Sequence, residues 1–377
     1  MAASGTERRV GTWRADHVGS LLRPPAVTQA RRRHAAGELD AAALRAVEDA
    51  AIAAAVVRQE AAGLPVVTDG DFRRGSFHID FLTRLRGIEH RPTRFAVGFQ
   101  GGPSAGHSPA VFHTVGRIAH EADITVADFA YLNSATARVA KVTMPSPSFA
   151  HARGGRAAID PAAYPDLGAF FADLAAAYRA EIGALAAAGC RYVQLDEVHY
   201  CFFCDPKLVA ALRARGEDPA ELAALYARLI NESIAGRPAD LAVGVHLCRG
   251  NQQSSWVAEG GYEPVAELLF NTVAADRFLL EYDSERAGGF EPLRFVPKGR
   301  MVVLGLVTSK SGRMETDDEL KRRIDEAARF VPIEQLALSP QCGFASSVAG
   351  NLIGEDEQWA KLALVSRVAE AVWGSVA

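Results

Sequence analysis

The sequence predicts an α/β protein of the (β/α)8 barrel (TIM barrel) class, with an inserted loop or hairpin around residues 92–120. Short apolar runs alternate with longer amphipathic stretches, which is the pattern of a parallel sheet covered by helices. Eight apolar runs can be counted, as a closed barrel requires, and polar residues follow many of them directly. No linker or internal repeat divides the chain, so residues 1–377 are expected to form a single barrel domain.

Each expected strand is an apolar run that ends at a turn or at a polar residue. The expected strands are residues 13–18, 65–67, 140–144, 192–195, 241–245, 277–280, 301–306 and 335–338. Helical spacing of apolar residues predicts helices at 39–62, 161–188, 206–236 (in two pieces), 264–270, around 292, 317–330 and 355–373. Residues 92–120 lack helical periodicity and contain Gly101, Gly102 and Pro103, so we expect them to leave the barrel as an insertion.

Composition excludes several classes of protein. The chain has 377 residues, a formal net charge of −4 and no basic stripe, so nucleic acid is not an expected partner. There is no run of 18 apolar residues, so no membrane span is expected. The N-terminal residues lack the apolar segment of a secretory signal. Five cysteines are few and odd in number, which favours a reducing, cytoplasmic compartment over a disulfide framework.

Four residues of metal-ligand type follow three of the expected strands: His246, Cys248, Glu281 and Cys342. Parallel barrel strands end on one face, so these side chains can converge on a single ion. Two thiolates, an imidazole and a carboxylate favour tetrahedral Zn²⁺ over Mg²⁺ or Ca²⁺. Each residue alone could be ordinary core, because free cysteine is often buried, but their joint placement favours zinc.

Other polar groups at strand ends admit both a functional and a structural interpretation. Asp196 and Glu197 could bind a substrate amine or act as acid and base, or they could cap the next helix. Gly19 and Ser20 could present a backbone N–H and a hydroxyl to a carboxylate, or form an ordinary turn. The segment 69–80, with its acids and arginines, could line a polar pocket or form a salt-bridged loop.

The remaining cysteines and histidines favour structural roles. Cys201 and Cys204 form a CxxC pair, but no second pair accompanies them, so packing or pocket lining is favoured over a second zinc or redox site. His107, His113 and His120 lie in or beside the insertion without strand-end placement, so we interpret them as loop histidines.

Taken together, these motifs resemble the cobalamin-independent methionine synthase family, and most closely its short, single-barrel members. The most specific stretches are residues 68–74, 194–198, 246–251, 280–283 and 338–344. The family transfers a methyl group to the sulfur of homocysteine to give methionine, and its long members carry an additional N-terminal half. The resemblance therefore implies a barrel and a zinc-dependent S-methyltransferase similar to 5-methyltetrahydropteroyltriglutamate–homocysteine methyltransferase.

The resemblance also implies roles for individual residues. The family's zinc ligands fall on His246, Cys248, Glu281 and Cys342. Its homocysteine contacts fall on Gly19, Ser20 and Asp196, with Asp80 and Glu197 as further acidic candidates. A tertiary-amine methyl donor is a poor leaving group that a general acid should protonate, and His199 and His78 are candidates by position.

The donor and the thiol stay open at this stage. The donor could be methyltetrahydrofolate, a methylated corrinoid protein or another methyl compound, because the half of the long enzymes that supplies part of the folate environment has no counterpart here. One alternative keeps the zinc but joins another thiol to an electrophile such as an epoxide, as in epoxyalkane–coenzyme M transferase. Another is a non-catalytic zinc- or thiol-binding barrel. A homodimer is an option that no sequence feature demonstrates. The insertion could form a lid.

Overall fold

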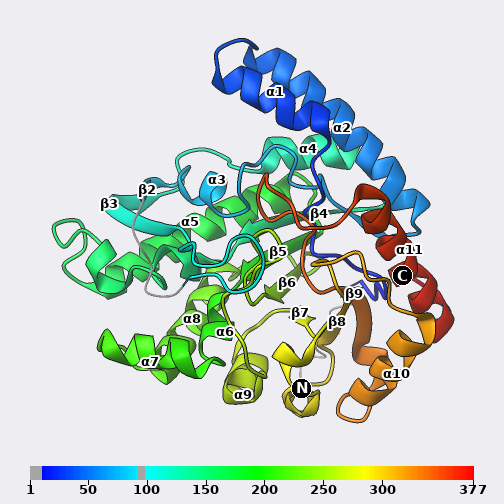
Figure 1. The fold of residues 1–377 in the computed structure, drawn as a ribbon. Helices are drawn as coiled ribbons and strands as arrows, with labels where there is room; N and C mark the ends of the chain where they lie inside the picture. The colour runs from blue at the N-terminus through cyan, green and yellow to red at the C-terminus, as the bar shows by residue number, and fades with distance from the viewer. Residues whose placement is uncertain (1–10, 92–97) are drawn as a thin grey trace, which may run out of the picture.

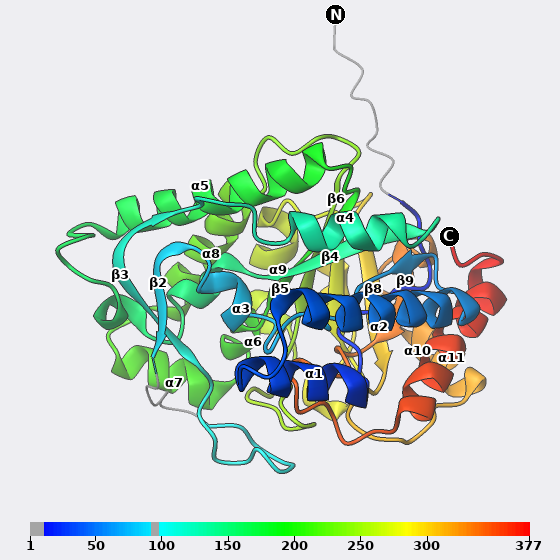
Figure 2. The ribbon, with the colours of Figure 1, turned by 90° about the horizontal axis from the view of Figure 1, so that it is seen from above.

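The computed structural model describes residues 11–91 and 98–377. A seven-stranded parallel sheet forms its centre, in the order β1-β4-β5-β6-β7-β8-β9. The strands are β1 (Val66–Val67), β4 (Val139–Pro145), β5 (Tyr192–Glu197), β6 (Ala242–Leu247), β7 (Arg277–Glu281), β8 (Met301–Val307) and β9 (Leu336–Pro340). Helices surround the curled sheet, as Figures 1 and 2 show. The predicted barrel class is therefore confirmed.

The first expected strand, residues 13–18, is reduced to a single parallel bridge between Ala15 and Leu338. Backbone hydrogen bonds join Asp16 N to Leu338 O at 2.9 Å and Leu338 N to Arg14 O at 2.8 Å. On the other side, Nε2 of the His17 ring lies 3.2 Å from Val66 O, so a side chain stands where a backbone ladder would be. The segment fills the eighth place in the ring without being a regular strand.

Many of the helices begin at an aspartate that accepts a backbone N–H, as Asp40, Asp166 and Asp218 do for α2, α5 and α8. The helices are α1 (Pro25–Ala35), α2 (Ala41–Ala61), α3 (Ile79–Leu82), α4 (Val126–Ser134), α5 (Leu167–Ala187), α6 (His199–Phe202), α7 (Pro206–Ala214), α8 (Pro219–Ser233), α9 (Glu263–Thr272), α10 (Asp317–Ala327) and α11 (Glu355–Trp373). Short 3-10 turns are η1 (Pro147–Ala150), η2 (Gly155–Ala158), η3 (Glu285–Ala287), η4 (Glu291–Phe295) and η5 (Ile333–Gln335). Across the described parts of the chain, no helix combines the length and apolar character needed to cross a membrane.

The insertion is an antiparallel hairpin of β2 (Arg86–Arg91) and β3 (Val111–Ala119), so it begins earlier than predicted. Residues 92–97 of the predicted insertion lie outside the described residues. Figures 1 and 2 show the hairpin on the opposite side of the barrel from α10 and α11. Within the described part of the connection between β2 and β3, Gln100 forms an antiparallel bridge with Trp256 in the loop after β6.

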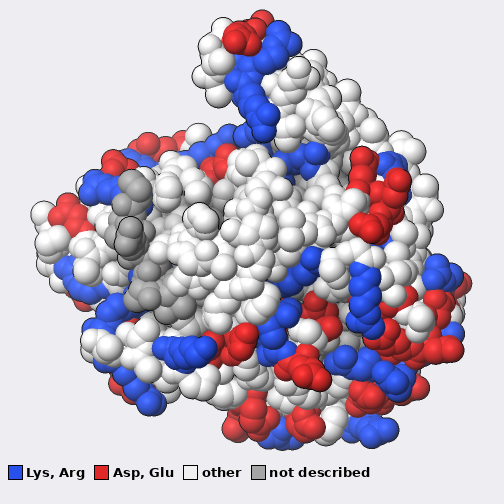
Figure 3. Space-filling model, viewed as in Figure 1, with Lys and Arg blue, Asp and Glu red and all other residues white. Residues whose placement is uncertain are grey.

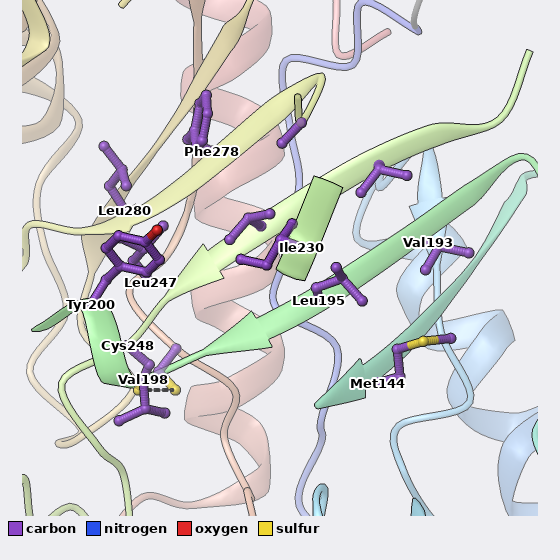
Figure 4. Packing of buried hydrophobic residues seen from close by; sticks show 14 of the residues in the cluster. Met144, Val193, Leu195, Val198, Tyr200, Ile230, Leu247, Cys248, Phe278 and Leu280 are labelled. Carbon is purple, nitrogen blue, oxygen red and sulfur yellow. Dashed lines mark hydrogen bonds between the residues drawn. The ribbon is translucent and has the colours of Figure 1, made fainter. Parts of the chain in front are cut away.

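Strand residues alternate between two environments, and this alternation places the candidate site. Val193 and Leu195 of β5 pack with Ile230 of α8 in the apolar layer between sheet and helices (Figure 4). Gln194 and Asp196, which lie between and after them, face the barrel interior. Because of this alternation, one face of the strand carries polar side chains to the barrel mouth and the other face packs against the helices.

The interior beneath the barrel mouth contains a compensated set of buried charges. Lys141 Nζ lies 2.8 Å from Asp16 Oδ1 and 3.0 Å from Gln194 Oε1, and Arg277 Nη2 lies 3.5 Å from Asp16 Oδ2. Burial alone would raise the pKa of Asp16, but the charges of Lys141 and Arg277 outweigh burial and lower it. These ion pairs fix the short first segment against β4 and β7.

Candidate active site

Three of the four predicted metal ligands converge at the carboxyl ends of β6 and β9. The ligand atoms of His246, Cys248 and Cys342 all lie within 4.8 Å of one another, and all three residues are buried. The two sulfur atoms are 3.4 Å apart, a contact that the dashed line at Cys248 marks in Figure 4. The hydrogen bond from Cys248 holds the pKa of the Cys342 thiol well below its usual range, and the charge of His246 adds to this effect.

The unpaired atoms of this cluster fit a metal ion. His246 Nδ1 lies 3.3 Å from Leu279 O, which makes Nδ1 the donor and leaves a lone pair on Nε2. That Nε2 atom is buried and has no hydrogen-bond partner among the described residues. In metal-binding histidines, the ring nitrogen that does not face the metal usually donates to a backbone carbonyl or a carboxylate, which fixes the orientation of the ring. The donor set of two sulfurs and one imidazole nitrogen suits Zn²⁺.

Glu281, the fourth predicted ligand, ends β7 and lies outside the close group. Its Oε2 atom accepts a hydrogen bond of 3.0 Å from the backbone N of Arg249, the residue after Cys248. Its Oε1 atom is buried without a hydrogen bond and lies 3.5 Å from Arg286 Nη2. The Glu281 carboxylate therefore lies outside the close group, with one oxygen bound to the Arg249 amide and the other in an ion pair with Arg286.

A small pocket, with about 30 Å³ of accessible space, opens onto the cluster. Its lining consists of Val18, Ser20, Asp71, Phe77, Thr143, Asp196, Val198, His246, Cys248, Cys342 and Ser346. This combination of apolar walls with a few polar groups is typical of sites that hold small molecules. Two carboxylates and a hydroxyl thus face the same small space as the two sulfurs.

Asp196 and Asp71 are buried carboxylates, and of the two only Asp71 has an ion-pair partner among the described residues, Arg74. Asp196 Oδ1 accepts from Gln194 Nε2 at 2.7 Å, and burial raises the pKa of Asp196 to about 7 although His246 nearby lowers it. Asp71 Oδ1 lies 3.3 Å from Arg74 Nη1, and burial raises the pKa of Asp71 in spite of that charge. An ammonium group in the pocket would stabilise both carboxylates in their charged form.

The predicted substrate contacts Gly19 and Ser20 lie at this pocket. Ser20 lines it, and Gly19 has φ +127°, a conformation that residues with a side chain rarely adopt. A Cβ at Gly19 would come within 2.8 Å of Thr143 Cγ2, so only glycine fits there.

Two of the predicted substrate contacts, Asp80 and Glu197, are not among the residues that line this pocket. Asp80 Oδ2 accepts a hydrogen bond of 2.7 Å from Ser76 N at the start of α3. The second acid of the pocket is Asp71, which lies in the short turn that follows β1. Sequence reasoning included Asp71 in a polar segment but not among the binding residues. Its position immediately after a strand was the signal that could have identified it.

Glu197 and the predicted general acid His199 belong to one buried network next to the pocket. Glu197 Oε2 accepts from Ser148 Oγ at 2.6 Å, and Ser148 Oγ lies 2.9 Å from His199 Nδ1. The His199 ring nitrogen is 3.4 Å from Glu197 Oε1. Burial lowers the pKa of His199, although Glu197 raises it. The network can position neighbouring groups but does not itself open into the thiol pocket.

His78, the other candidate acid, lines a second and larger cleft of about 560 Å³. Its Nδ1 lies 2.7 Å from Ser76 Oγ, and its Nε2 lies 3.4 Å from Arg153 Nη1. Burial and the charge of Arg153 hold the pKa of His78 well below its usual value, so the imidazole is neutral. The cleft adjoins the thiol pocket, because Phe77 and Ser346 line both.

The CxxC pair lies apart from the cluster. Cys201 and Cys204 are buried free thiols in α6 and just after it, and neither lines the thiol pocket. Burial raises the pKa of Cys204 to about 12 and that of Cys201 well above its usual value. Both thiols are therefore protonated near neutral pH, as packing residues are.

A second group of ligand-type atoms joins His120, Asp123 and Glu181 on the outer side of the hairpin. Glu181 already accepts hydrogen bonds from His120, from Ile124 N at 2.9 Å and from Thr125 N at 2.7 Å. Its carboxylate closes the start of α4 and has no oxygen left over, so the group has a structural explanation.

Residues 14–370 match the family described as the cobalamin-independent synthase, catalytic domain. The chain belongs to this family. It is 44% identical to YxjH of Bacillus subtilis, an uncharacterized protein, over 99% of this chain and 98% of that one. A crystal structure of a candidate vitamin-B12 independent methionine synthase from Listeria monocytogenes has a TM-score of 0.78 and 37% identity, covering 97% of this chain and all of that one. The methionine synthase of Pyrococcus abyssi is 26% identical over 79% of this chain and 76% of its own length.

These comparisons confirm the family that the motifs at the strand ends predicted. The near-complete coverage of the Bacillus and Listeria proteins also agrees with the short form of the family, since neither extends far beyond one barrel.

Proposed function

We propose that this protein is a zinc-dependent methyltransferase that moves a methyl group to the thiol of homocysteine and so forms methionine. The observation that carries the proposal is the sharing of one small pocket by a His246–Cys248–Cys342 cluster and two carboxylates. Asp71 and Asp196 would hold the ammonium group of an amino acid whose sulfur then reaches the cluster. Membership of the family supports the same reaction.

His246, Cys248 and Cys342 would hold the zinc, and Glu281 would be an exchangeable fourth ligand. When bound, zinc lowers the pKa of a substrate thiol so that a thiolate forms near neutral pH, and it fixes that thiolate in place. The contacts of Glu281 support an exchangeable role, because Arg286 and the Arg249 amide can stabilise the carboxylate when it is not bound to the metal.

The residues of the chain then orient the two reactants. Ser20 and the turn at Gly19 receive the substrate carboxylate, while the two aspartates fix its amine. The thiolate attacks the methyl carbon, a C–S bond forms, and the bond from the methyl group to its donor nitrogen breaks with its electron pair left on nitrogen. A proton then neutralises that nitrogen. Correct placement of both reactants can supply about 7–11 kcal/mol of the barrier lowering at best.

His78 is the better placed of the two candidate acids, because it lines the cleft from which a donor would approach. Its imidazole is neutral in the absence of donor, so an anionic group beside it would be needed to raise its pKa before it could supply a proton. His199 would act through the Ser148–Glu197 network rather than on the donor.

The other two functions find less support in the site. A sulfonate thiol, such as one that reacts with an epoxide, would meet two carboxylates in the pocket, which is unfavourable. A closed structural zinc site would have four ligands in contact, whereas only three converge here among the described residues.

The test is a methyl-transfer assay on protein of known zinc content. Homocysteine would be combined with 5-methyltetrahydrofolate, as the mono- and triglutamate, and separately with methylcobalamin. The expected result is methionine and about one zinc per chain, as a single tetrahedral site requires. Zinc without methionine from any donor would move the assignment to another thiol, and full activity without zinc would overturn it.

A further inference from the structure

The larger cleft beside the thiol pocket has walls that are held together by specific contacts. Two loops from opposite ends of the sheet pair along one wall. Phe77 N donates to Ser346 O at 3.2 Å, and Val348 N donates to Gly75 O at 3.1 Å. The loop after β1 and the loop after β9 therefore form one continuous surface that leads from the cleft to the pocket.

The opposite wall joins the hairpin insertion to the loop that follows Cys248. Gln100 N donates to Trp256 O at 2.6 Å, and Ser104 Oγ donates to Gln253 Oε1 at 3.2 Å. Gly101 lies against the Trp256 ring so closely that a Cβ would come within 2.2 Å of it. The described part of the insertion, for which a lid was one option from the sequence, is thus docked on the barrel as part of the cleft.

The lining of the cleft favours an anion. The described residues that line it include no carboxylate, but they include Arg153, the histidines His78, His90 and His107, and several amide and hydroxyl side chains. Figure 3 shows that the middle of the face seen in Figure 1 is mostly uncharged, while acidic groups gather nearer the edge. An anionic ligand would therefore meet little repulsion on its way to Arg153.

Arg153 is buried without the partner that a buried arginine normally has. It is 7% exposed, and its Nε atom has no hydrogen-bond partner among the described residues. Its Nη1 atom donates to Ala110 O at 2.9 Å, and the guanidinium lies 4.9 Å from the centre of the Phe149 ring. No ion pair joins Arg153 to a carboxylate of the described chain. The charge of Glu197 raises the pKa of Arg153, but the two side chains form no ion pair. A buried cation left in this state costs free energy that an anionic ligand would recover.

The backbone around Arg153 is also fixed in advance. Arg215 donates from Nη1 to Arg153 O at 2.8 Å and from Nη2 to Ala152 O at 2.9 Å. Arg215 in turn is paired with Glu217. A guanidinium held in one place before binding loses little freedom when a ligand arrives, which is a property of built recognition sites.

We propose that this cleft binds the methyl donor and that Arg153 holds an anionic group, a carboxylate or a phosphate, which the donor carries. The proposal rests on the proposed methyl transfer and adds the chemical class of the second substrate. A donor with glutamate carboxylates or a phosphodiester fits this class, whereas a cationic sulfonium or ammonium donor does not. Phe77 and Ser346 line both the cleft and the thiol pocket, so the methyl group of a donor bound in the cleft would lie next to that pocket.

A binding experiment tests the subsite without any need for turnover. p-Aminobenzoyl-L-glutamate would be titrated calorimetrically into the zinc-loaded protein, with its diamide as the uncharged probe and inorganic phosphate as the second anion. We expect Arg153→Gln to weaken the binding of the preferred anion about 10- to 100-fold, the range for losing charged hydrogen bonds. Arg322→Gln, which removes an exposed arginine of α10, is the matched control and should leave affinity unchanged.

A second substitution avoids disturbing a buried residue. Val348 lines the cleft and is 51% exposed, so Val348→Asp should fold normally. We expect Val348→Asp to weaken anion binding about 3- to 10-fold at low salt and less at high salt. Val348→Asn introduces a side chain of the same shape as aspartate without its charge, and it should leave anion binding unchanged. If the glutamate probe binds more tightly than phosphate, the anion is a carboxylate, and the reverse order indicates a phosphate group.

The outcomes separate this proposal from the proposed function. Arg153-dependent anion binding without methionine formation from any donor would leave the subsite standing and overturn the methyl transfer. Methionine formation with the same donor KM in Arg153→Gln and the unaltered protein would leave the methyl transfer standing and overturn the subsite. Equal affinity of Arg153→Gln and the unaltered protein for both anions would also overturn it.

Discussion

The sulfur atoms of Cys248 and Cys342 lie 3.4 Å apart although 94 positions separate the two residues in the sequence. They follow β6 and β9, which are three places apart in the sheet. In a flat sheet, three places correspond to about 14 Å between strands. Contact between the sulfurs therefore depends on the curvature of the barrel, which brings distant strand ends towards one axis.

Removal of one sulfur should abolish the metal site. We expect Cys342→Ser to lose zinc during dialysis against a chelator, with a fall in affinity beyond the about 10- to 100-fold typical of losing an outer partner. Metal content by mass spectrometry measures this directly. Cys201→Ser is the control, because the Cys201 thiol is buried outside the cluster. That variant should retain the zinc of the unaltered protein. Equal zinc in both variants would contradict the assignment.

Substitution of Asp71 and of Asp80 should have different effects on the KM for homocysteine. We expect Asp71→Asn to raise the KM for homocysteine about 10- to 100-fold, because the charged contact to the amine is lost from a buried site. Asparagine tolerates the positive φ of 60° at this position, so the backbone should hold. Asp80→Asn should leave KM nearly unchanged, since Asp80 only accepts from Ser76 N. The opposite ranking would restore the sequence-based assignment.

The two candidate acids should differ in their effect on turnover. We expect His78→Gln to lower kcat about 10²- to 10⁴-fold while the KM for homocysteine stays constant, as loss of a proton donor does. His199→Gln should lower kcat less, because His199 acts through Ser148 and Glu197. Steady-state kinetics with both substrates varied would show the difference, and a larger effect at His199 would reverse the roles.

The fold could be predicted largely from the sequence because buried parallel strands are short apolar runs with clear ends. Seven of the eight expected strands are present within a few residues of their predicted bounds. Helix α1 escaped prediction because it buries only Val27 and Ala30 and so has no apolar stripe. The strand expected at 13–18 contains apolar residues, but Asp16 and His17 turn its hydrogen bonding towards side chains.

The metal cluster could be predicted for a similar reason, since ligand types at strand ends must meet on one barrel face. Arg153 could not, because its role depends on which side chains remain unpaired after folding. Arg153 lies in a loop beyond η1, and nothing in its neighbours marks it as buried without a carboxylate. The cytoplasmic location and the homodimer stay predictions, since neither is decided by the fold of one chain.

Acid should destabilise the folded protein through His151. This residue is 3% exposed, its Nδ1 lies 2.9 Å from Tyr226 Oη, and burial lowers its pKa to about 4. In the unfolded chain a histidine has a pKa of about 6.5. Between these two values the unfolded state binds a proton that the folded state does not, so the free energy of unfolding falls as pH falls.

The slope is about 1.4 kcal/mol per pH unit, or roughly 3 kcal/mol across the window from pH 6.5 to 4. His151→Gln keeps an amide near Tyr226 but does not titrate in this window. Urea unfolding of both proteins at a series of pH values should therefore show that the variant loses less stability than the unaltered protein. Groups that titrate elsewhere are common to both and cancel in the difference. Parallel pH profiles would mean that His151 is not buried in its neutral form, and that the packing between η1 and α8 is looser than the structure shows.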